Sequence, residues 1–224
     1  MLKAAQALRA QSASALPDPA RPLRKSRPQL AAIAVGASTG GPQALVQMLR
    51  TLASGKLNAA LLVAIHTPAE FCQSVAVMME RESGREVVVP TSPELVRPDV
   101  VYMPAGNMHL RLMKRLGSAY IESCAAPHDV RYRPCIDVLF DSAAYVYGPR
   151  LMAVVLTGMG ADGLDGARVV SASGGCVLAQ KPETCVVESM PSAVISAGLA
   201  QRSETPEALA AHILLRTRAD AYAR

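Results

Sequence analysis

Three polar residues with complementary chemistry each come at or shortly after the end of an apolar run. Ser38 follows the run 30–35, His66 follows the run 59–65, and Asp162 comes shortly after the run 151–156. A serine hydroxyl becomes a nucleophile when a base takes its proton, and a histidine base needs a carboxylate that holds its ring in the correct tautomer. The three residue types are therefore those of a hydrolytic triad.

The loop around Ser38 admits two interpretations. Its sequence over 36–42 is Gly-Ala-Ser-Thr-Gly-Gly-Pro, which could cradle a phosphate or present a serine on a sharp turn. A dinucleotide site would need G-x-G-x-x-G, a P-loop would need a following Lys-Ser/Thr, and a ribose site would need an acidic residue where His66 ends the second run. None of these is present, and the four histidines show no metal-ligand spacing. The pattern favours a hydrolase without cofactor or metal.

Each residue also has a structural interpretation. Ser38 could serve a glycine turn, His66 could be a core residue at a strand end, and Asp162 could cap a helix. The carboxyl ends of parallel strands share one edge of a doubly wound sheet, however, so residues far apart in sequence can meet there. Their common placement at three strand ends favours a site. The glycine loop 157–163 is expected to supply backbone N–H donors for an oxyanion.

The elements that must position these residues alternate between strand and helix. Unbroken apolar runs predict buried strands, and apolar residues at helical spacing predict amphipathic helices. Strands are expected at 30–35, 59–65, 86–90, 151–156 and 176–179, and helices at 42–52, 71–79, 136–147, 164–172, from 191 and from 206. Short strands at 100–103, 109–112 and 119–122 predict an antiparallel extension or hairpin. The fold class is α/β, a doubly wound, mainly parallel, Rossmann-like three-layer sheet with that extension.

Composition places the chain among single α/β domains. It has 224 residues, of which 50% are hydrophobic and 18% charged, and residues 30–224 are expected to form one domain. The formal charge of +5 resides in the first 30 residues, because the remainder carries 17 residues of each sign. Residues 1–29 are rich in proline, alanine and arginine and predict a disordered basic tail. The domain itself shows no basic face or aromatic platform for nucleic acid.

The number and spacing of the cysteines and the lack of long apolar segments indicate a cytoplasmic location. The five cysteines are odd in number and never spaced C-x-x-C, which is typical of reduced thiols. No apolar stretch approaches the roughly 18 residues of a membrane helix, and the N-terminus lacks the apolar core of a signal peptide. We expect a cytoplasmic protein with no direct membrane insertion.

Five short motifs follow one another along the chain. They are Gly36-Ala-Ser-Thr-Gly-Gly-Pro42, His66-Thr-Pro-Ala-Glu-Phe71, Arg133-Pro-Cys-Ile-Asp-Val-Leu-Phe140, Thr157-Gly-Met-Gly-Ala-Asp-Gly163 and Met190-Pro191. In order and approximate spacing they resemble the bacterial chemotaxis methylesterase family, the CheB catalytic domain, over about residues 31–199. The resemblance implies hydrolysis of glutamate γ-methyl esters on the cytoplasmic signalling helices of chemoreceptors. In many members it also implies deamidation of receptor glutamines.

The same resemblance implies the role of each site residue. Ser38 is then the nucleophile, His66 the general base and Asp162 its orienting carboxylate. The backbone N–H of Met159 and the region of Thr39 lie near the oxyanion. The family fold, a parallel doubly wound sheet with an antiparallel extension, agrees with the pattern of runs above.

Regulation is the point at which the chain departs from the family. Chemotaxis members usually carry an N-terminal receiver domain, which 30 residues cannot hold, so we expect a stand-alone form controlled, if at all, by a separate regulatory protein. The alternative to an esterase is a non-catalytic signalling or scaffold module that keeps the fold. The three intact triad residues favour the esterase.

Overall fold

A computed structural model describes residues 28–219 of the chain. Of the tail predicted at 1–29, all but the last two residues lie outside that range, so its disorder stays a prediction. In the described part, Leu30 is already buried, and the backbone N–H of Ala31 donates to the carbonyl of Arg150 at 2.9 Å. The folded domain therefore includes the chain from about residue 30.

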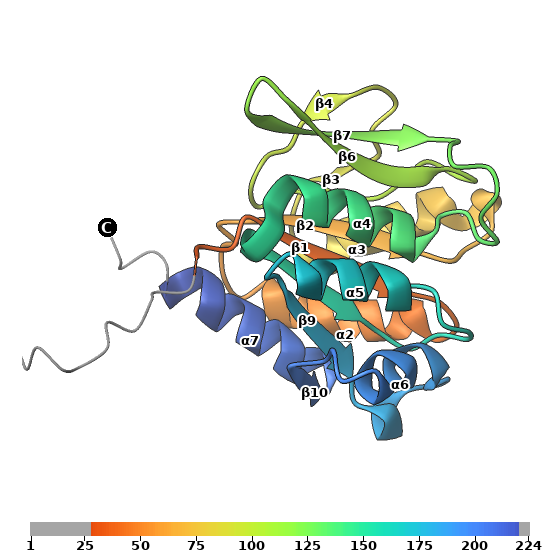
Figure 1. The fold of residues 1–224 in the computed structure, drawn as a ribbon, viewed down its shortest axis with the longest axis vertical. Coiled ribbons are helices and arrows are strands. Elements are labelled where there is room, and N and C mark those ends of the chain that lie inside the picture. The colour runs from red at the N-terminus through yellow and green to blue at the C-terminus, as the bar shows by residue number, and fades with distance from the viewer. Residues whose placement is uncertain (1–27, 220–224) are drawn as a thin grey trace, which may run out of the picture.

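The centre of the fold is a parallel sheet of seven strands (Figure 1). Its order is β10-β9-β8-β1-β2-β5-β3, and each neighbouring pair is parallel. The strands are β1 (Ala32–Ala37), β2 (Ala60–Ile65), β3 (Val87–Val88), β5 (Val101–Tyr102), β8 (Leu151–Val155), β9 (Cys176–Gln180) and β10 (Arg202–Glu204). All residues of β1, β2, β8 and β9 are buried, as their unbroken apolar runs predict.

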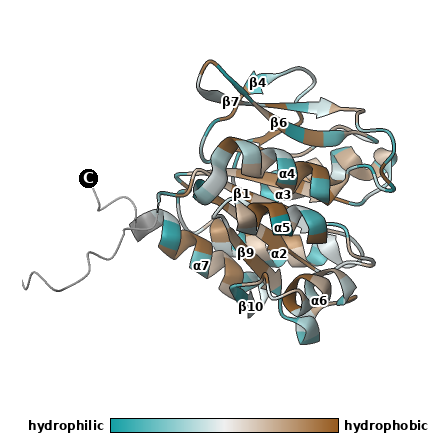
Figure 2. Ribbon diagram, viewed as in Figure 1, coloured by the Kyte–Doolittle hydropathy of each residue, from teal (hydrophilic) through white to brown (hydrophobic). Residues whose placement is uncertain are grey.

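Helices cover both faces of this sheet. One face packs against α2 (Gly41–Leu52), α3 (Cys72–Ser83) and α7 (Pro206–Ala219), and the other against α4 (Ile136–Tyr147), α5 (Leu164–Ala172) and α6 (Ser189–Ser196). Alternate residues of each central strand point into the two apolar layers, so Ile33 and Val35 face one and Ala32 and Ala34 the other. Figure 2 shows the brown, apolar strands between helices whose outer faces are paler or teal. The predicted three-layer αβα class is confirmed.

A second sheet of three antiparallel strands lies over α4, at the top of Figure 1. It consists of β4 (Glu94–Leu95), β7 (Ser118–Cys124) and β6 (His109–Arg115), in the order β4-β7-β6. The expected hairpin at 109–122 is therefore present. The expectation that 100–103 also belongs to this extension is wrong. Val101 and Tyr102 form β5, which lies between β2 and β3 in the parallel sheet and is fully buried there.

The topology brings the predicted site residues to one edge. From β1 the chain goes through α2 to β2 on one side, and it returns through α4, on the opposite face, to β8 on the other side. The carboxyl ends of β1, β2 and β8 therefore meet at a topological switch point, where ligands bind in such folds. None of the helices in residues 28–219 has both the length and the apolar character needed to span a membrane.

Candidate active site

Ser38 lies in the turn between β1 and α2. Its backbone N–H donates to the carbonyl of Thr157 at 3.0 Å, and its carbonyl accepts from the N–H of Gly41 at 2.7 Å. Between them Gly40 takes a φ of 80°, and a Cβ at this position would lie 2.6 Å from Val186. Both the left-handed backbone and the close neighbour require glycine there. The turn thus fixes the Ser38 side chain at the start of α2.

His66 is the first residue after β2, and its ring lies between Ser38 and Asp162. The Nδ1 atom is 3.1 Å from Ser38 Oγ, and the Nε2 atom is 2.7 Å from Asp162 Oδ2. An ionised carboxylate can only accept hydrogen bonds, so Nε2 carries the ring proton and donates a hydrogen bond to Asp162. In the neutral ring Nδ1 is then the acceptor that faces the serine hydroxyl. This is the arrangement in which the ring can take the serine proton.

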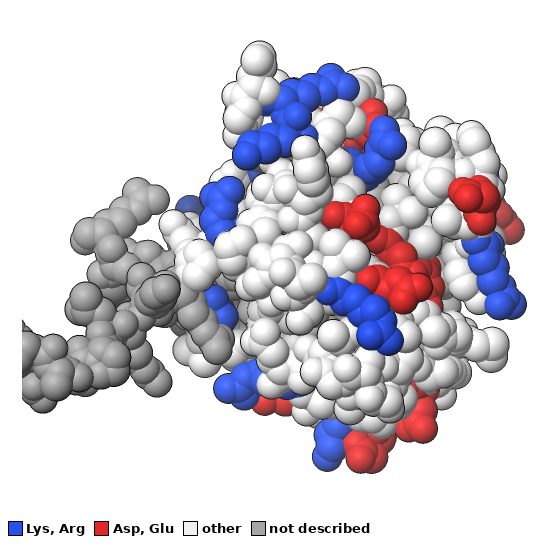
Figure 3. Space-filling model, in the orientation of Figure 1, with Lys and Arg blue, Asp and Glu red and all other residues white. Residues whose placement is uncertain are grey.

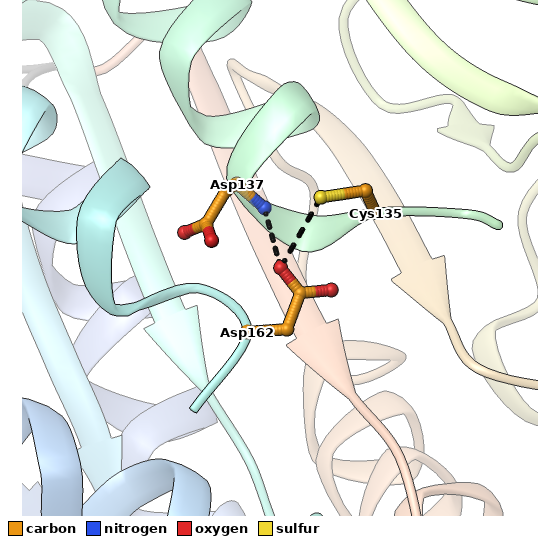
Figure 4. A group of neighbouring side chains, drawn as sticks. All are labelled: Cys135, Asp137 and Asp162. Atoms are coloured by element: carbon orange, nitrogen blue, oxygen red, sulfur yellow. Dashed lines mark hydrogen bonds between the residues drawn. The ribbon is translucent and has the colours of Figure 1, made fainter. Parts of the chain in front are cut away.

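Asp162 is held by the first turn of α4. Its Oδ2 accepts from the N–H of Ile136 at 2.8 Å, and its Oδ1 accepts from the N–H of Asp137 at 3.0 Å and from the Cys135 thiol at 3.3 Å (Figure 4). Burial raises the pKa of Asp162, but the hydrogen bonds from His66 and from these two backbone groups outweigh it and hold the pKa below its usual value. The carboxylate is therefore ionised at neutral pH and available to orient His66.

Asp137 performs the reciprocal contact. Its Oδ1 accepts from the backbone N–H groups of Gly163 at 2.9 Å and Gly166 at 2.7 Å, at the start of α5. Asp162 thus caps α4 from the loop before α5, and Asp137 caps α5 from the first turn of α4. Burial and the neighbouring Asp162 carboxylate raise the pKa of Asp137 to about 6 despite the opposing Gly166 hydrogen bond. The two aspartates lock the loop that carries Asp162 onto α4.

His109 completes the support of this helix end. Its Nδ1 accepts from the backbone N–H of Cys135 at 3.1 Å, and its Nε2 donates to the carbonyl of Pro127 at 3.1 Å. Burial, with Arg133 nearby, lowers the pKa of His109 against the Pro127 hydrogen bond, so the ring is neutral. His109 is fully buried. Its contact to Cys135 positions the turn that binds Asp162.

Cys135, Asp137 and Asp162 are the group within residues 28–219 whose side chains lie close enough to bind one metal ion. Their donor atoms are already used: both Asp162 oxygens accept hydrogen bonds, and Asp137 Oδ1 accepts two. Burial and the Asp162 charge raise the pKa of the Cys135 thiol to about 12, so it stays protonated, whereas metals bind the thiolate. Helix capping explains the cluster.

Tyr132 stacks on the His66 ring, a contact that the sequence motifs do not predict. The two ring centroids lie 4.4 Å apart with planes 20° from parallel, and the Arg131 guanidinium lies 5.2 Å from the tyrosine centroid. Beside this stack is a cavity of about 290 Å³ lined by His66, Thr67, Pro68, Tyr132 and Arg133. The stack restricts rotation of the ring. Its only sequence signal is that Tyr132 directly precedes the motif that begins at Arg133.

The predicted oxyanion region is formed by the turn after β1 and the glycine loop after β8. In the described residues the N–H groups of Thr39 and Met159 donate to no protein acceptor, while the Met159 side chain is exposed. A Cβ on Gly158 would collide with Met190 Sδ and lie 2.7 Å from Ser38 Cβ. Glycine at 158 therefore lets the loop approach the serine closely. The role of Met159 and Thr39 at the oxyanion stays a prediction.

Thr157 ties three loops of this edge together. Its hydroxyl lies 3.0 Å from the carbonyls of Thr39 and Val187 and accepts from the Val187 N–H, while its own N–H donates to the Gln180 side chain at 2.9 Å. Thr157 and Gln180 are both almost fully buried. A buried hydroxyl with three backbone neighbours fixes the relative position of the loops after β1, β8 and β9.

Comparison with known proteins relates this geometry to a family. The family model described as CheB methylesterase matches residues 33–213. Protein-glutamate methylesterase/protein-glutamine glutaminase of Nocardioides sp. is 40% identical over 170 residues, 76% of this chain and 46% of that protein. An enzyme of the same description from Vibrio cholerae is 36% identical over 182 residues, 81% of this chain and 48% of that protein. The chain thus spans about half the length of the curated relatives it matches.

A solved structure gives the same result for the fold. The crystal structure of the Thermotoga maritima CheB methylesterase catalytic domain superposes with a TM-score of 0.79 at 32% identity, covering 84% of this chain and 99% of that one. The half of the relatives that this chain matches is therefore the part that corresponds to a catalytic domain. On the family match, the relatives and the fold together, the chain belongs to the CheB methylesterase family.

Proposed function

We propose that this chain hydrolyses γ-methyl esters of glutamate side chains through Ser38, His66 and Asp162. The observation that carries the proposal is the pair of contacts made by His66, at 3.1 Å to Ser38 Oγ and 2.7 Å to Asp162 Oδ2. The relatives named above as protein-glutamate methylesterases support the substrate. The family supports methylated chemoreceptors as the proteins that carry it.

The reaction follows from the hydrogen bonds of the three residues. Ser38 Oγ attacks the ester carbonyl carbon while its proton passes to His66 Nδ1, and Asp162 stabilises the imidazolium that forms. His66 then returns this proton to the methoxy oxygen, so methanol leaves and an acyl-serine remains. Water deprotonated by His66 attacks the acyl carbon, which releases the glutamate carboxyl group and restores Ser38. In this proposal the Thr39 and Met159 N–H groups bind the carbonyl oxygen as it becomes negative.

The same acyl-serine forms from a glutamine side chain, with ammonia in place of methanol. The names of the relatives include a glutaminase activity beside the esterase, which supports deamidation as a second reaction of this site. An ester is the easier substrate, because methanol needs less assistance from a general acid than an amine does. A cytoplasmic location, the absence of a nucleic-acid partner and control by a separate regulatory protein stay predictions.

The test is methanol release from membranes that contain methylated receptors. Ser38→Ala should fold with an unchanged Tm. Its rate of methanol release should be about 10³-fold or more below that of the intact protein. The remaining rate should not exceed the 10³–10⁴-fold acceleration over water that binding and an oxyanion site give alone. The matched control is Ser74→Ala, an exposed serine on α3, which should behave like the intact protein. Full turnover by Ser38→Ala would contradict the assignment of Ser38 as nucleophile, and no turnover by the intact chain would favour the non-catalytic alternative.

A further inference from the structure

Two arginines beside His66 differ from most arginines of the domain. Seven of the described arginines lie within 4.0 Å of an aspartate or glutamate: Arg50, Arg81, Arg85, Arg97, Arg111, Arg168 and Arg202. Arg131 and Arg133 have no such partner in residues 28–219, although Asp129 is only two residues away from Arg131. On the face that Figure 3 shows, many charged side chains lie close to one of opposite sign. The edge that carries the triad thus has two unneutralised cations.

The contacts of these arginines hold them beside the base. Arg131 lies over the Tyr132 ring, which stacks on His66, and Arg133 lines the cavity that His66 also lines. Arg133 Nη2 donates to the Nδ1 and the carbonyl of His128, at 3.1 and 3.3 Å. Its Nε and Nη1 donate to no group in the described residues. The guanidinium is therefore anchored at one nitrogen and has further donors available to a ligand.

Binding of the substrate ester does not by itself require these two cations. A methyl ester is neutral, and its carbonyl oxygen is expected to bind the backbone N–H groups of Thr39 and Met159. Arginine donates charge-assisted hydrogen bonds to carboxylates, and half-buried Arg133 lines the cavity with its Nε and Nη1 still available as donors. In a helical substrate, residues three and four positions from the ester lie about 5–6 Å from it on the same face. With the ester at Ser38, a carboxylate at these positions is a candidate partner for the arginines, because Arg133 lines the same cavity as His66.

We infer that Arg131 and Arg133 form a subsite for a carboxylate that lies one helical turn from the ester in the substrate. The inference rests on the proposed function and adds a substrate class to it, an acidic helical segment. The subsite explains why no aspartate or glutamate of the described residues pairs with the two arginines. It also places specificity in the segment 131–133, next to the residue that stacks on the catalytic base.

Two peptides test the inference. Both are helical and carry one central glutamate γ-methyl ester. One has glutamate three and four positions before and after the ester, and the other has glutamine at the same positions. The intact chain should show a kcat/KM about tenfold higher on the acidic peptide, mostly through a lower KM, as expected for a charge-assisted hydrogen bond near the surface. The preference should shrink as added salt screens it.

Arginine variants test whether Arg131 and Arg133 cause the preference for the acidic peptide. Arg131→Gln combined with Arg133→Gln should make kcat/KM equal on the two peptides, while Arg133→Lys should keep part of the preference. Arg150→Gln is the matched control, because Arg150 also lies outside the ion pairs above but lines a cavity at the opposite end of β8. It should keep the full preference. Equal kcat/KM on both peptides, or a preference that survives the double substitution, would overturn the inference.

A binding measurement separates this inference from the proposed function. The Ser38→Ala chain, which has both arginines, should bind the fluorescently labelled acidic peptide about tenfold more tightly than the glutamine peptide. If the intact chain hydrolyses neither peptide but the binding difference is present, the esterase is contradicted and the subsite is supported. Hydrolysis of both without a binding difference would support the esterase and contradict the subsite. No measurable binding of the acidic peptide would also contradict the subsite.

Discussion

Asp162→Asn tests whether the carboxylate works through His66 or only caps a helix. The wild-type carboxylate accepts four hydrogen bonds, two on each oxygen, and an asparagine offers one oxygen and one amino group in their place. If the asparagine oxygen faces His66, its amino group faces the Asp137 N–H. If the oxygen faces Asp137, the amino group faces both the Ile136 N–H and His66 Nε2.

The expected magnitudes follow from these two orientations. In either one a backbone N–H of the first turn of α4 loses its acceptor, which costs about 1–3 kcal/mol of folding free energy. In the second, the amino group also forces the His66 proton onto Nδ1, so the ring no longer accepts from Ser38. Both orientations remove the negative charge that stabilises the imidazolium. By analogy with the same change in a serine protease we expect kcat to fall by about 10⁴, or about 5 kcal/mol in activation free energy.

The assay combines methanol release with thermal unfolding. We expect a large fall in kcat with little change in KM, and a Tm lower by several degrees. Asp165→Asn is the matched control, because Asp165 lies in the first turn of α5 with an 86% exposed side chain, and it should change neither quantity. A lower Tm with kcat within about tenfold of the intact chain would mean that Asp162 is a helix cap alone, because the triad analogy requires about 10⁴.

Two further substitutions probe the support of the site. Asp137→Asn keeps an oxygen for the Gly163 and Gly166 N–H groups but removes an acid whose pKa burial raises to about 6 in the folded chain. An acid whose pKa is raised in the folded state loses its stabilising contribution as pH rises through that pKa. The Tm of the variant minus the Tm of the intact chain should therefore increase from pH 4 to pH 7. A Tm difference that does not change with pH would contradict this. Gly158→Ala should push the loop away from Ser38 and Met190, lowering kcat and costing about 1–3 kcal/mol of stability, and a wild-type kcat would show that the close approach is unnecessary.

The central fold could be predicted from sequence because its strands are buried on both faces. The runs ending at Val35, Ile65 and Leu156 have no polar residue, and the helix predicted at 136–147 has those bounds in the structure. The sequence pattern predicts the wrong sheet for the segment 100–103, because a two-residue strand has no periodicity of its own. Only its burial between β2 and β3 places it. The strands β4 and β10 were missed for the same reason of length.

The site residues also divide into those that the sequence predicts and those that it does not. Ser38, His66 and Asp162 follow strands that a doubly wound topology brings to one edge, so their proximity could be predicted from order alone. Tyr132 and His109 could not, because they lie in segments whose path depends on tertiary contacts with α4 and the antiparallel sheet. Asp137 looked like an ordinary helix residue. Its partners are backbone N–H groups 26 and 29 residues away, which no local pattern reveals.

The first turn of α4 explains why fold and site are difficult to separate in this protein. The N–H groups of Cys135, Ile136 and Asp137 are the donors that an α-helix leaves without intrahelical partners, and here they are accepted by His109 and Asp162. The positive end of the helix stabilises the Asp162 charge, which opposes the cost of its burial. Asp137 returns the contact to α5, so neither cap can form unless both helices are in place. The carboxylate that orients His66 is therefore ionised and correctly placed only when this part of the domain has folded.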